Sequence, residues 1–141
     1  MEIAKDLVDQ IVAHALQEAP NECCGVVAVE PAADGQPARA RKVRAAVNLH
    51  KSPKRFEIDG REVLAATNEF DAAGWEVGAI YHSHTHTAPY PSQTDVNFAR
   101  NWPGVEWIIV GLADPDAPEV RCYAIEEGQV REVALAPAAV A

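Results

Sequence analysis

The residues best suited to chemistry lie in one short stretch, from His82 to Asp95. His82 and His84 are two positions apart, so in an extended strand both imidazoles point to the same face. Asp95 follows a proline-containing loop and lies in the first turn of an expected helix. Two imidazole nitrogens and one carboxylate oxygen suit a catalytic zinc, because they leave a fourth tetrahedral position for water. The stretch predicts one Zn²⁺ per chain, bound by His82, His84 and Asp95.

A zinc site that activates water also needs a base outside the set of ligands. Zinc lowers the pKa of a bound water to about 7, and a nearby carboxylate can pass its proton to a leaving amine. Glu22 is our candidate, because it precedes a buried strand expected to start at Cys24. Its carboxylate faces the metal only if that strand lies beside the strand expected over Val77 to Tyr81. The sequence leaves this adjacency open, and a surface carboxylate at a strand start is the simpler interpretation.

Ser92 and Asp95 have a structural interpretation as well. Their S-x-x-D spacing is that of a capping box at a helix N-terminus. The two interpretations are compatible, because a residue that caps the helix also faces the loop where the metal would lie. His86 continues the alternation of His82 and His84, so a site with three histidine ligands is the alternative.

The same residues, in the same order, resemble the signature of the JAMM (MPN+) zinc metalloproteases. The matching elements are Glu22, His82-Ser83-His84 and Ser92-Gln93-Thr94-Asp95. The resemblance extends over nearly the whole chain, and the Pro-Asn-Glu-Cys-Cys-Gly and His-Thr-His-Thr-Ala-Pro-Tyr-Pro stretches are similar to the small bacterial stand-alone members. It implies the zinc ligands and the base named above. It also implies that the Ser92 hydroxyl stabilises the tetrahedral oxyanion.

The bacterial members are similar to enzymes that act on a ubiquitin-like sulfur-carrier protein. The implied reaction hydrolyses the amide after the carrier's C-terminal glycine and releases an attached cysteine, a step of cysteine biosynthesis. The carrier's tail would add as a strand to a sheet edge near the site. Two alternatives are a general isopeptidase that removes ubiquitin-like modifiers from protein lysines, and a non-catalytic MPN scaffold module.

Several regular elements must position these residues. Apolar residues from Ile3 to Leu16 recur at helical spacing, Glu62 to Ala73 contains good helix formers, and a short helix is expected to begin near Ser92. Phe56 and Ile58 alternate with polar residues, as in an edge strand. The remaining strands are expected over residues 24–29, 40–47, 77–81, 107–112, 120–125 and 130–133.

Helices interspersed among six or seven strands, with short turns late in the chain, predict an α/β (α+β) fold with a mixed sheet and helices packed on it. The resemblance implies that the sheet is curved and the architecture is the MPN-like, cytidine-deaminase-like α-β-α type. The length of 141 residues suits one domain. We expect that domain over residues 1–135, followed by a flexible tail over residues 136–141.

The composition limits the classes of partner. Lys and Arg number 12 and Asp and Glu number 21, so the net charge is −9. Phosphate backbones and anionic lipids repel such a chain, which predicts neither nucleic acid nor membrane as partners. No apolar run approaches the roughly 20 residues of a membrane-spanning helix, and the first residues do not resemble a signal peptide. We therefore expect a cytoplasmic protein, and the sequence predicts no particular oligomeric state.

The other reactive or charged groups have ordinary interpretations. Cys23 and Cys24 are expected to be reduced, small residues of a buried strand rather than reactive thiolates. The basic cluster of Lys51, Lys54 and Arg55 stands out on an acidic chain. It is either a solvated face or a contact for the carrier's tail or for a carboxylate of the leaving group.

Overall fold

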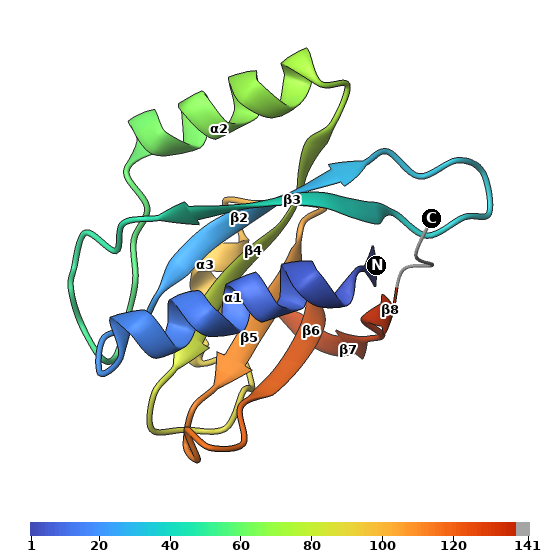
Figure 1. The fold of residues 1–141 in the computed structure, drawn as a ribbon. Helices are drawn as coiled ribbons and strands as arrows, with labels where there is room; N and C mark the ends of the chain where they lie inside the picture. Colours follow the sequence, from blue (N-terminus) through green and yellow to red (C-terminus); the bar gives the residue numbers. More distant parts are fainter. Residues whose placement is uncertain (138–141) are drawn as a thin grey trace.

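Residues 1–137 of the computed structural model form three helices and one mixed β-sheet (Figure 1). The helices are α1 (Lys5–Glu18), α2 (Gly60–Ala72) and α3 (Gln93–Ala99). The strands are β1 (Glu2–Ile3), β2 (Cys24–Glu30), β3 (Arg39–Ala46), β4 (Glu76–His84), β5 (Glu106–Gly111), β6 (Glu119–Glu126), β7 (Gln129–Val133) and β8 (Ala136–Pro137). The expected α+β class with a mixed sheet is confirmed.

The strand order in the sheet is β7-β6-β5-β4-β2-β3-β1-β8. At the centre, β4 pairs antiparallel with β2 and parallel with β5. Antiparallel neighbours flank this centre, because β2 pairs with β3 and β5 pairs with β6. The strand β2, which follows Glu22, therefore lies directly beside β4, which contains Val77–Tyr81. This is the adjacency that the sequence left open.

The two faces of the sheet carry separate cores. Side chains alternate along each central strand, so Ile108 and Val110 of β5 pack on the α1 side with Ile11, whereas Trp107 packs on the other side with Phe70 of α2. Figure 1 shows α1 crossing one face of the sheet, with α3 behind the strands. The face shared by α2 and α3 is the one that receives the functional residues.

The boundaries near both ends of the chain differ from the sequence expectations. Glu2 and Ile3 form the short strand β1, so the first helix begins only at Lys5. Ala136 and Pro137 form β8, which pairs with β1, and residues 138–141 of the expected tail lie outside the described residues. No helix within residues 1–137 is long and apolar enough to cross a membrane.

The expected edge strand around Phe56 and Ile58 is wrong. Both side chains are buried, but residues 48–58 form a loop, which we call the Asn48 loop. The buried Asn48 side chain takes the place of a strand partner: its Nδ2 donates to the carbonyl of Arg55, and its Oδ1 accepts from the N–H of Glu57. A side chain that satisfies the loop's own backbone removes the need for a neighbouring strand.

Gly25 provides a test of how closely β2 and β4 are packed. A Cβ at Gly25 would overlap the ring of Tyr81, which is fully buried and hydrogen bonded to Nδ1 of His14. We expect Gly25→Ala to lower the free energy of unfolding by about 1–3 kcal/mol, the typical cost of overpacking a core. Urea unfolding followed by circular dichroism measures this.

The matched control for that substitution is Gly60→Ala at the start of α2, where an added Cβ meets nothing within 4 Å. This variant should unfold within about 0.5 kcal/mol of the parent. Equal stability of the two variants would contradict the close packing of Tyr81 on Gly25.

Candidate functional site

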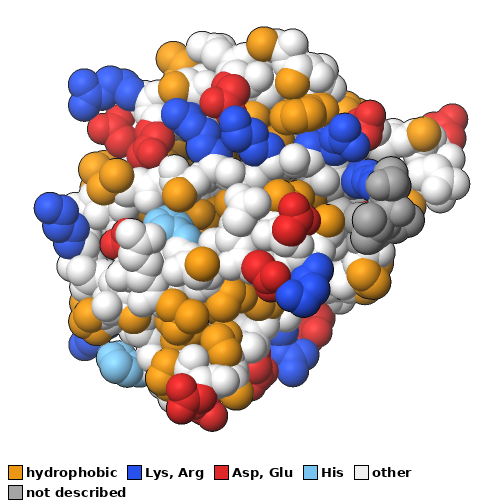
Figure 2. All heavy atoms as spheres, in the orientation of Figure 1, with side chains coloured by type: hydrophobic (Ala, Val, Ile, Leu, Met, Phe, Trp, Pro, Cys, Tyr) orange, Lys and Arg blue, Asp and Glu red, His pale blue; other side chains and the backbone are white. Residues whose placement is uncertain are grey.

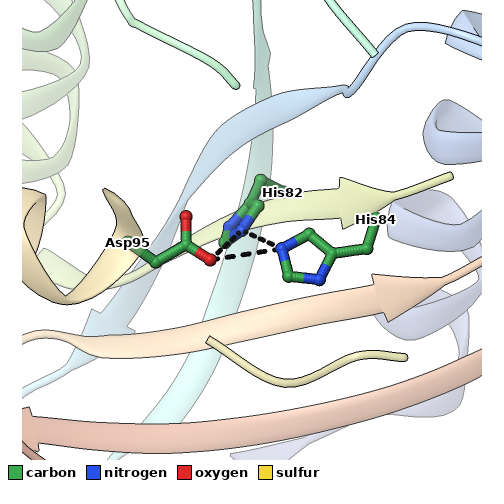
Figure 3. Close-up of side chains that lie close together, drawn as sticks. All are labelled: His82, His84 and Asp95. Carbon is green, nitrogen blue, oxygen red and sulfur yellow. Dashed lines mark hydrogen bonds and ion pairs between the residues drawn. The ribbon is translucent and has the colours of Figure 1, made fainter. Parts of the chain in front are cut away.

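Three predicted ligands converge in the structure (Figure 3). Nε2 of His82 lies 3.2 Å from Nε2 of His84, and Oδ2 of Asp95 lies 3.1 Å from the first nitrogen and 3.2 Å from the second. All three side chains are buried. Ligands about 2.0–2.1 Å from one tetrahedral Zn²⁺ lie roughly 3.3 Å from each other. The spacing of the three donor atoms therefore fits a single zinc ion.

The strand β4 positions both histidines. Ile80, His82 and His84 alternate with residues that face α1, so the two imidazoles emerge on the side of α3. The ring of Phe56 stacks on His82 with centroids 4.6 Å apart. Nδ1 of His82 is buried and has no hydrogen-bond partner among the described residues. On the Nδ1 side, packing against Phe56 rather than a hydrogen bond thus holds this ring.

His84 is oriented by a hydrogen bond on the far side of its ring. Its Nδ1 lies 2.9 Å from the carbonyl oxygen of Ala88. A carbonyl only accepts, so Nδ1 carries a proton, and release of the second ring proton leaves Nε2 with a lone pair for a metal. This is the tautomer that a metal-binding imidazole requires, and an outer acceptor of this kind commonly fixes it.

The start of α3 positions Asp95. The Ser92 side chain accepts from the N–H of Asp95 at 3.1 Å, and Oδ2 of Asp95 accepts from the N–H of Ser92 at 2.9 Å. The expected capping box is therefore present, and its carboxylate is the one that faces the histidines. Capping and ligation are compatible in one residue because a carboxylate oxygen has more than one lone pair.

Electrostatics keep Asp95 ionised despite its burial. Burial alone raises the pKa of Asp95, but the His82 and His84 imidazoles and the Ser92 N–H outweigh it and hold the pKa well below its usual range. For His84, burial lowers the pKa, and the hydrogen bonds to Asp95 and to the carbonyl of Ala88 raise it by more. The site thus holds an anionic oxygen beside two imidazoles, a donor set suited to a divalent cation.

Glu22 lies beside this cluster. In the β2–β4 ladder Cys24 pairs with His82, and continuing the antiparallel register by two residues places Glu22 level with His84. The residue is 5% exposed. Burial raises the pKa of Glu22 to about 8, while the charge of His84 opposes the shift and that of Asp95 adds to it. A buried carboxyl with a pKa near neutrality is suited to carrying a proton in both directions.

The Asn48 loop fixes the backbone of Glu22. The N–H of Glu22 donates to the carbonyl of Ser52 at 2.9 Å, and its carbonyl accepts from Nδ2 of Asn48 at 3.1 Å. Sequence reasoning missed both Asn48 and Phe56 as supports of the site. Their roles depend on contacts between distant segments, for which the local sequence carries no signal.

The remaining candidates lie outside the cluster. His86 is exposed and does not join the three donors among residues 1–137, so the three-histidine alternative has no support. Burial raises the pKa of Cys23 and Cys24 to about 12, which makes both poor nucleophiles. Ser83 faces away from the site, where its Oγ accepts from the N–H of Cys23 at 2.9 Å and braces β2 on β4.

Residues 4–126 match the family described as prokaryotic homologs of the JAB domain. The chain belongs to this family. The chain is 37% identical to the CysO-cysteine peptidase of Mycobacterium tuberculosis over 130 residues, which are 92% of this chain and 86% of that protein. It is 32% identical to a probable TtuB-protein conjugate cleaving protease of Thermus thermophilus over 134 residues, 94% of this chain and 80% of that protein.

The fold of this JAB-domain protein also matches solved structures. A protein from Desulfitobacterium hafniense, solved in solution, superposes with a TM-score of 0.85 at 31% identity, covering 97% of this chain and 92% of that one. The resemblance noted in the sequence is therefore confirmed at the level of the family and of the fold.

The raised pKa of Glu22 predicts a pH-dependent stability in metal-free protein. The unfolded chain releases this proton near pH 4.5, whereas the folded chain holds it until about pH 8. Stability therefore falls as the pH rises through this window, because the unfolded state binds fewer protons there. Glutamine has no such proton. We expect chelated Glu22→Gln to gain stability over the parent from pH 5 to pH 8, by on the order of a few kcal/mol.

Urea unfolding at several pH values measures this gain, with Glu76→Gln as control because Glu76 is exposed at the start of β4. The control should follow the parent at every pH. A constant difference between Glu22→Gln and the parent would contradict the protonated, buried state of Glu22.

Proposed function

We propose that this protein is a zinc-dependent hydrolase that cleaves the amide after the C-terminal glycine of a ubiquitin-like sulfur-carrier protein. The observation that carries the proposal is the convergence of three buried donor atoms beside a buried, protonatable carboxyl. His82, His84 and Asp95 would hold one zinc ion. Zinc, when bound, supplies a Lewis acid that polarises the scissile carbonyl and acidifies the attacking water.

Glu22 moves the proton in this scheme. Its carboxylate takes a proton from the attacking water and delivers it to the nitrogen of the breaking amide, so the amine leaves in its stable protonated form. The raised pKa of Glu22 favours this task, because the group binds the proton readily and gives it up without a large energy cost. The rigid backbone contacts of Glu22 to the Asn48 loop keep the carboxyl in place.

Ser92 supplies a hydrogen bond to the developing oxyanion. Its Oγ already accepts from the N–H of Asp95, so the hydroxyl proton remains free to donate. The side chain is exposed at the N-terminus of α3, next to the ligand Asp95, where a substrate carbonyl can reach it. Donors placed in this way typically contribute about 10²–10³ in rate.

The substrate class follows from the relatives and from the shape of the sheet. The M. tuberculosis relative is named a CysO-cysteine peptidase, which supports cysteine, an amino acid, as the leaving group. Beyond Arg39, β3 pairs with β2 on one side and has no ladder partner on the other among residues 1–137. An extended carrier tail can add to this edge.

The three cysteine thiols are free and buried, in agreement with the reducing cytoplasm that we propose as the location of this protein.

A general isopeptidase is the second candidate, because the T. thermophilus relative is named for protein conjugates. Two adducts of one sulfur-carrier protein separate the candidates, one with free cysteine and one with a protein lysine. We expect faster release of cysteine. Faster cleavage of the lysine adduct would favour the isopeptidase, and failure to cleave either would favour a non-catalytic module.

The metal content tests the site itself. We expect about one equivalent of zinc per chain in untagged protein and little in His82→Ala prepared in the same way, because the variant loses one of three ligands. Elemental mass spectrometry measures both. His86→Ala is the matched control, since His86 is exposed and outside the cluster, and it should retain zinc. Zinc-free parent protein after reconstitution would refute the metal site.

Two substitutions separate metal binding from proton transfer. We expect Glu22→Gln to retain zinc but to lose at least about 10² in kcat, because only the base is removed. We expect Asp95→Asn to lose both zinc and activity, because an amide is a weaker ligand than a carboxylate. Turnover of the carrier-cysteine adduct and zinc content are measured on the same samples. Normal turnover by Glu22→Gln would show that another group is the base.

A further inference from the structure

A small cavity opens beside Glu22, between the end of α1 and the Asn48 loop. Its volume is about 180 Å³, which is below the range of drug-sized sites but large enough for one amino acid. We call it the Glu22 cavity, and it is lined by Glu18, Asn21, Glu22, Cys23, Ala46, Val47, Asn48 and Lys51. The reaction proposed above uses only one of these side chains.

The proposed chemistry determines which part of a substrate would enter this cavity. Hydrolysis breaks the amide C–N bond, the water oxygen joins the carbonyl carbon, and the nitrogen leaves with the proton from Glu22. The leaving nitrogen must therefore lie against the Glu22 carboxyl. Ser92 and Asp95 lie at the start of α3, whereas the cavity extends from Glu22 toward β3 and the Asn48 loop. The substituents of the leaving amine are then the groups nearest to the cavity.

Lys51 is the positively charged residue among those that line this cavity. It lines the cavity, is exposed, and makes no ion pair with any residue in the range 1–137. Its backbone has a positive φ of 45°, and its N–H donates to the carbonyl of Asn48. The Asn48 loop thus holds a lysine in a conformation that L-residues adopt rarely, beside the catalytic carboxyl.

The other polar groups of the cavity set the balance of charge. Asn21 adds a side-chain amide that can donate to an anion. Glu18 lines the opposite side and carries a carboxylate 3.8 Å from Nε2 of His14. A ligand carboxylate is therefore attracted by Lys51 and repelled by Glu18, so its preferred place is at the Lys51 side.

We propose that the Glu22 cavity binds the leaving group, and that Lys51 selects an amine that carries a free α-carboxylate. This inference rests on the proposed function and names its substrate class. A released amino acid has its carboxylate one carbon from the leaving nitrogen, within the dimensions of the cavity. A lysine of a protein conjugate has an apolar stem at that place and no carboxylate, so Lys51 gives it no advantage.

The test uses two matched substrates, one ubiquitin-like sulfur-carrier protein joined to cysteine and the same carrier joined to cysteinamide, in which the carboxylate is neutralised. We expect zinc-loaded Lys51→Gln to lose about tenfold in kcat/KM on the cysteine adduct and to stay within about twofold of the parent on the amide, because only a charge-assisted contact is lost. Lys51→Arg should restore most of the loss. Glu18→Gln, on the opposite side, should raise kcat/KM on the cysteine adduct.

Lys54→Gln is the matched control, because Lys54 is on the same loop but does not line the cavity. It should leave both substrates unchanged. An equal loss on both substrates in Lys51→Gln, or no loss on either, would overturn the role of Lys51. Failure of the parent to cleave both adducts would refute the proposed function on this carrier instead.

Binding of an amino acid to the Glu22 cavity can be measured without turnover. S-methylcysteine lacks a free thiol, so it reports on the cavity rather than on a metal. In metal-free protein we expect it to shift the amide NMR signals of Asn21 and Lys51, and we expect weaker shifts from S-methylcysteinamide and in Lys51→Gln. Equal shifts from the acid and the amide would overturn carboxylate selection even if the enzyme proves inactive.

Discussion

The pairing of β2 with β4 is the contact on which the rest of the site depends. Its register sets Cys24 opposite His82, and in an antiparallel ladder opposite residues share a face. Glu22 and His84, two residues further along each strand, therefore meet on the side of α3. A shift of one residue would turn the histidines toward α1 and away from Asp95. The register is held by buried side chains on both faces, among them Tyr81 packed on Gly25.

Burial determines the protonation state of the two carboxyl groups of the site, Asp95 and Glu22. A buried carboxylate costs free energy unless it is paired and hydrogen bonded. Asp95 meets this condition through two imidazoles and the Ser92 N–H, so it stays ionised. The carboxyl of Glu22 has no hydrogen-bond partner among residues 1–137, and burial raises its pKa to about 8. Two carboxyl groups in one site thus have opposite protonation states, which suits one to bind a cation and the other to carry a proton.

The Asn48 loop contacts both Glu22 and the cluster of His82, His84 and Asp95. Its buried asparagine holds the carbonyl of Glu22, its Phe56 stacks on His82, and its Lys51 lines the cavity beside Glu22. One segment therefore contacts a proposed metal ligand and the proposed base, and it contains the proposed leaving-group contact. Figure 2 shows a row of blue Lys and Arg side chains across the upper part of one face, with red carboxylates both among them and below them. The net charge of −9 makes such local concentrations of cations significant for an anionic substrate group.

The sequence alone determined much of this protein, because the strongest signals are local. The two-residue spacing of His82 and His84 and the S-x-x-D cap at Ser92 are properties of a strand and a helix start, and the residue types define their chemistry. The mixed sheet with helices packed on it also followed from the order of apolar patterns. Only the tertiary structure decided that β2 lies beside β4 and so brings Glu22 to the cluster. It also decided that Phe56 belongs to a loop rather than an edge strand, because one buried asparagine satisfies that loop. Strand adjacency and loop conformation depend on contacts between residues far apart in the chain, which no local pattern encodes.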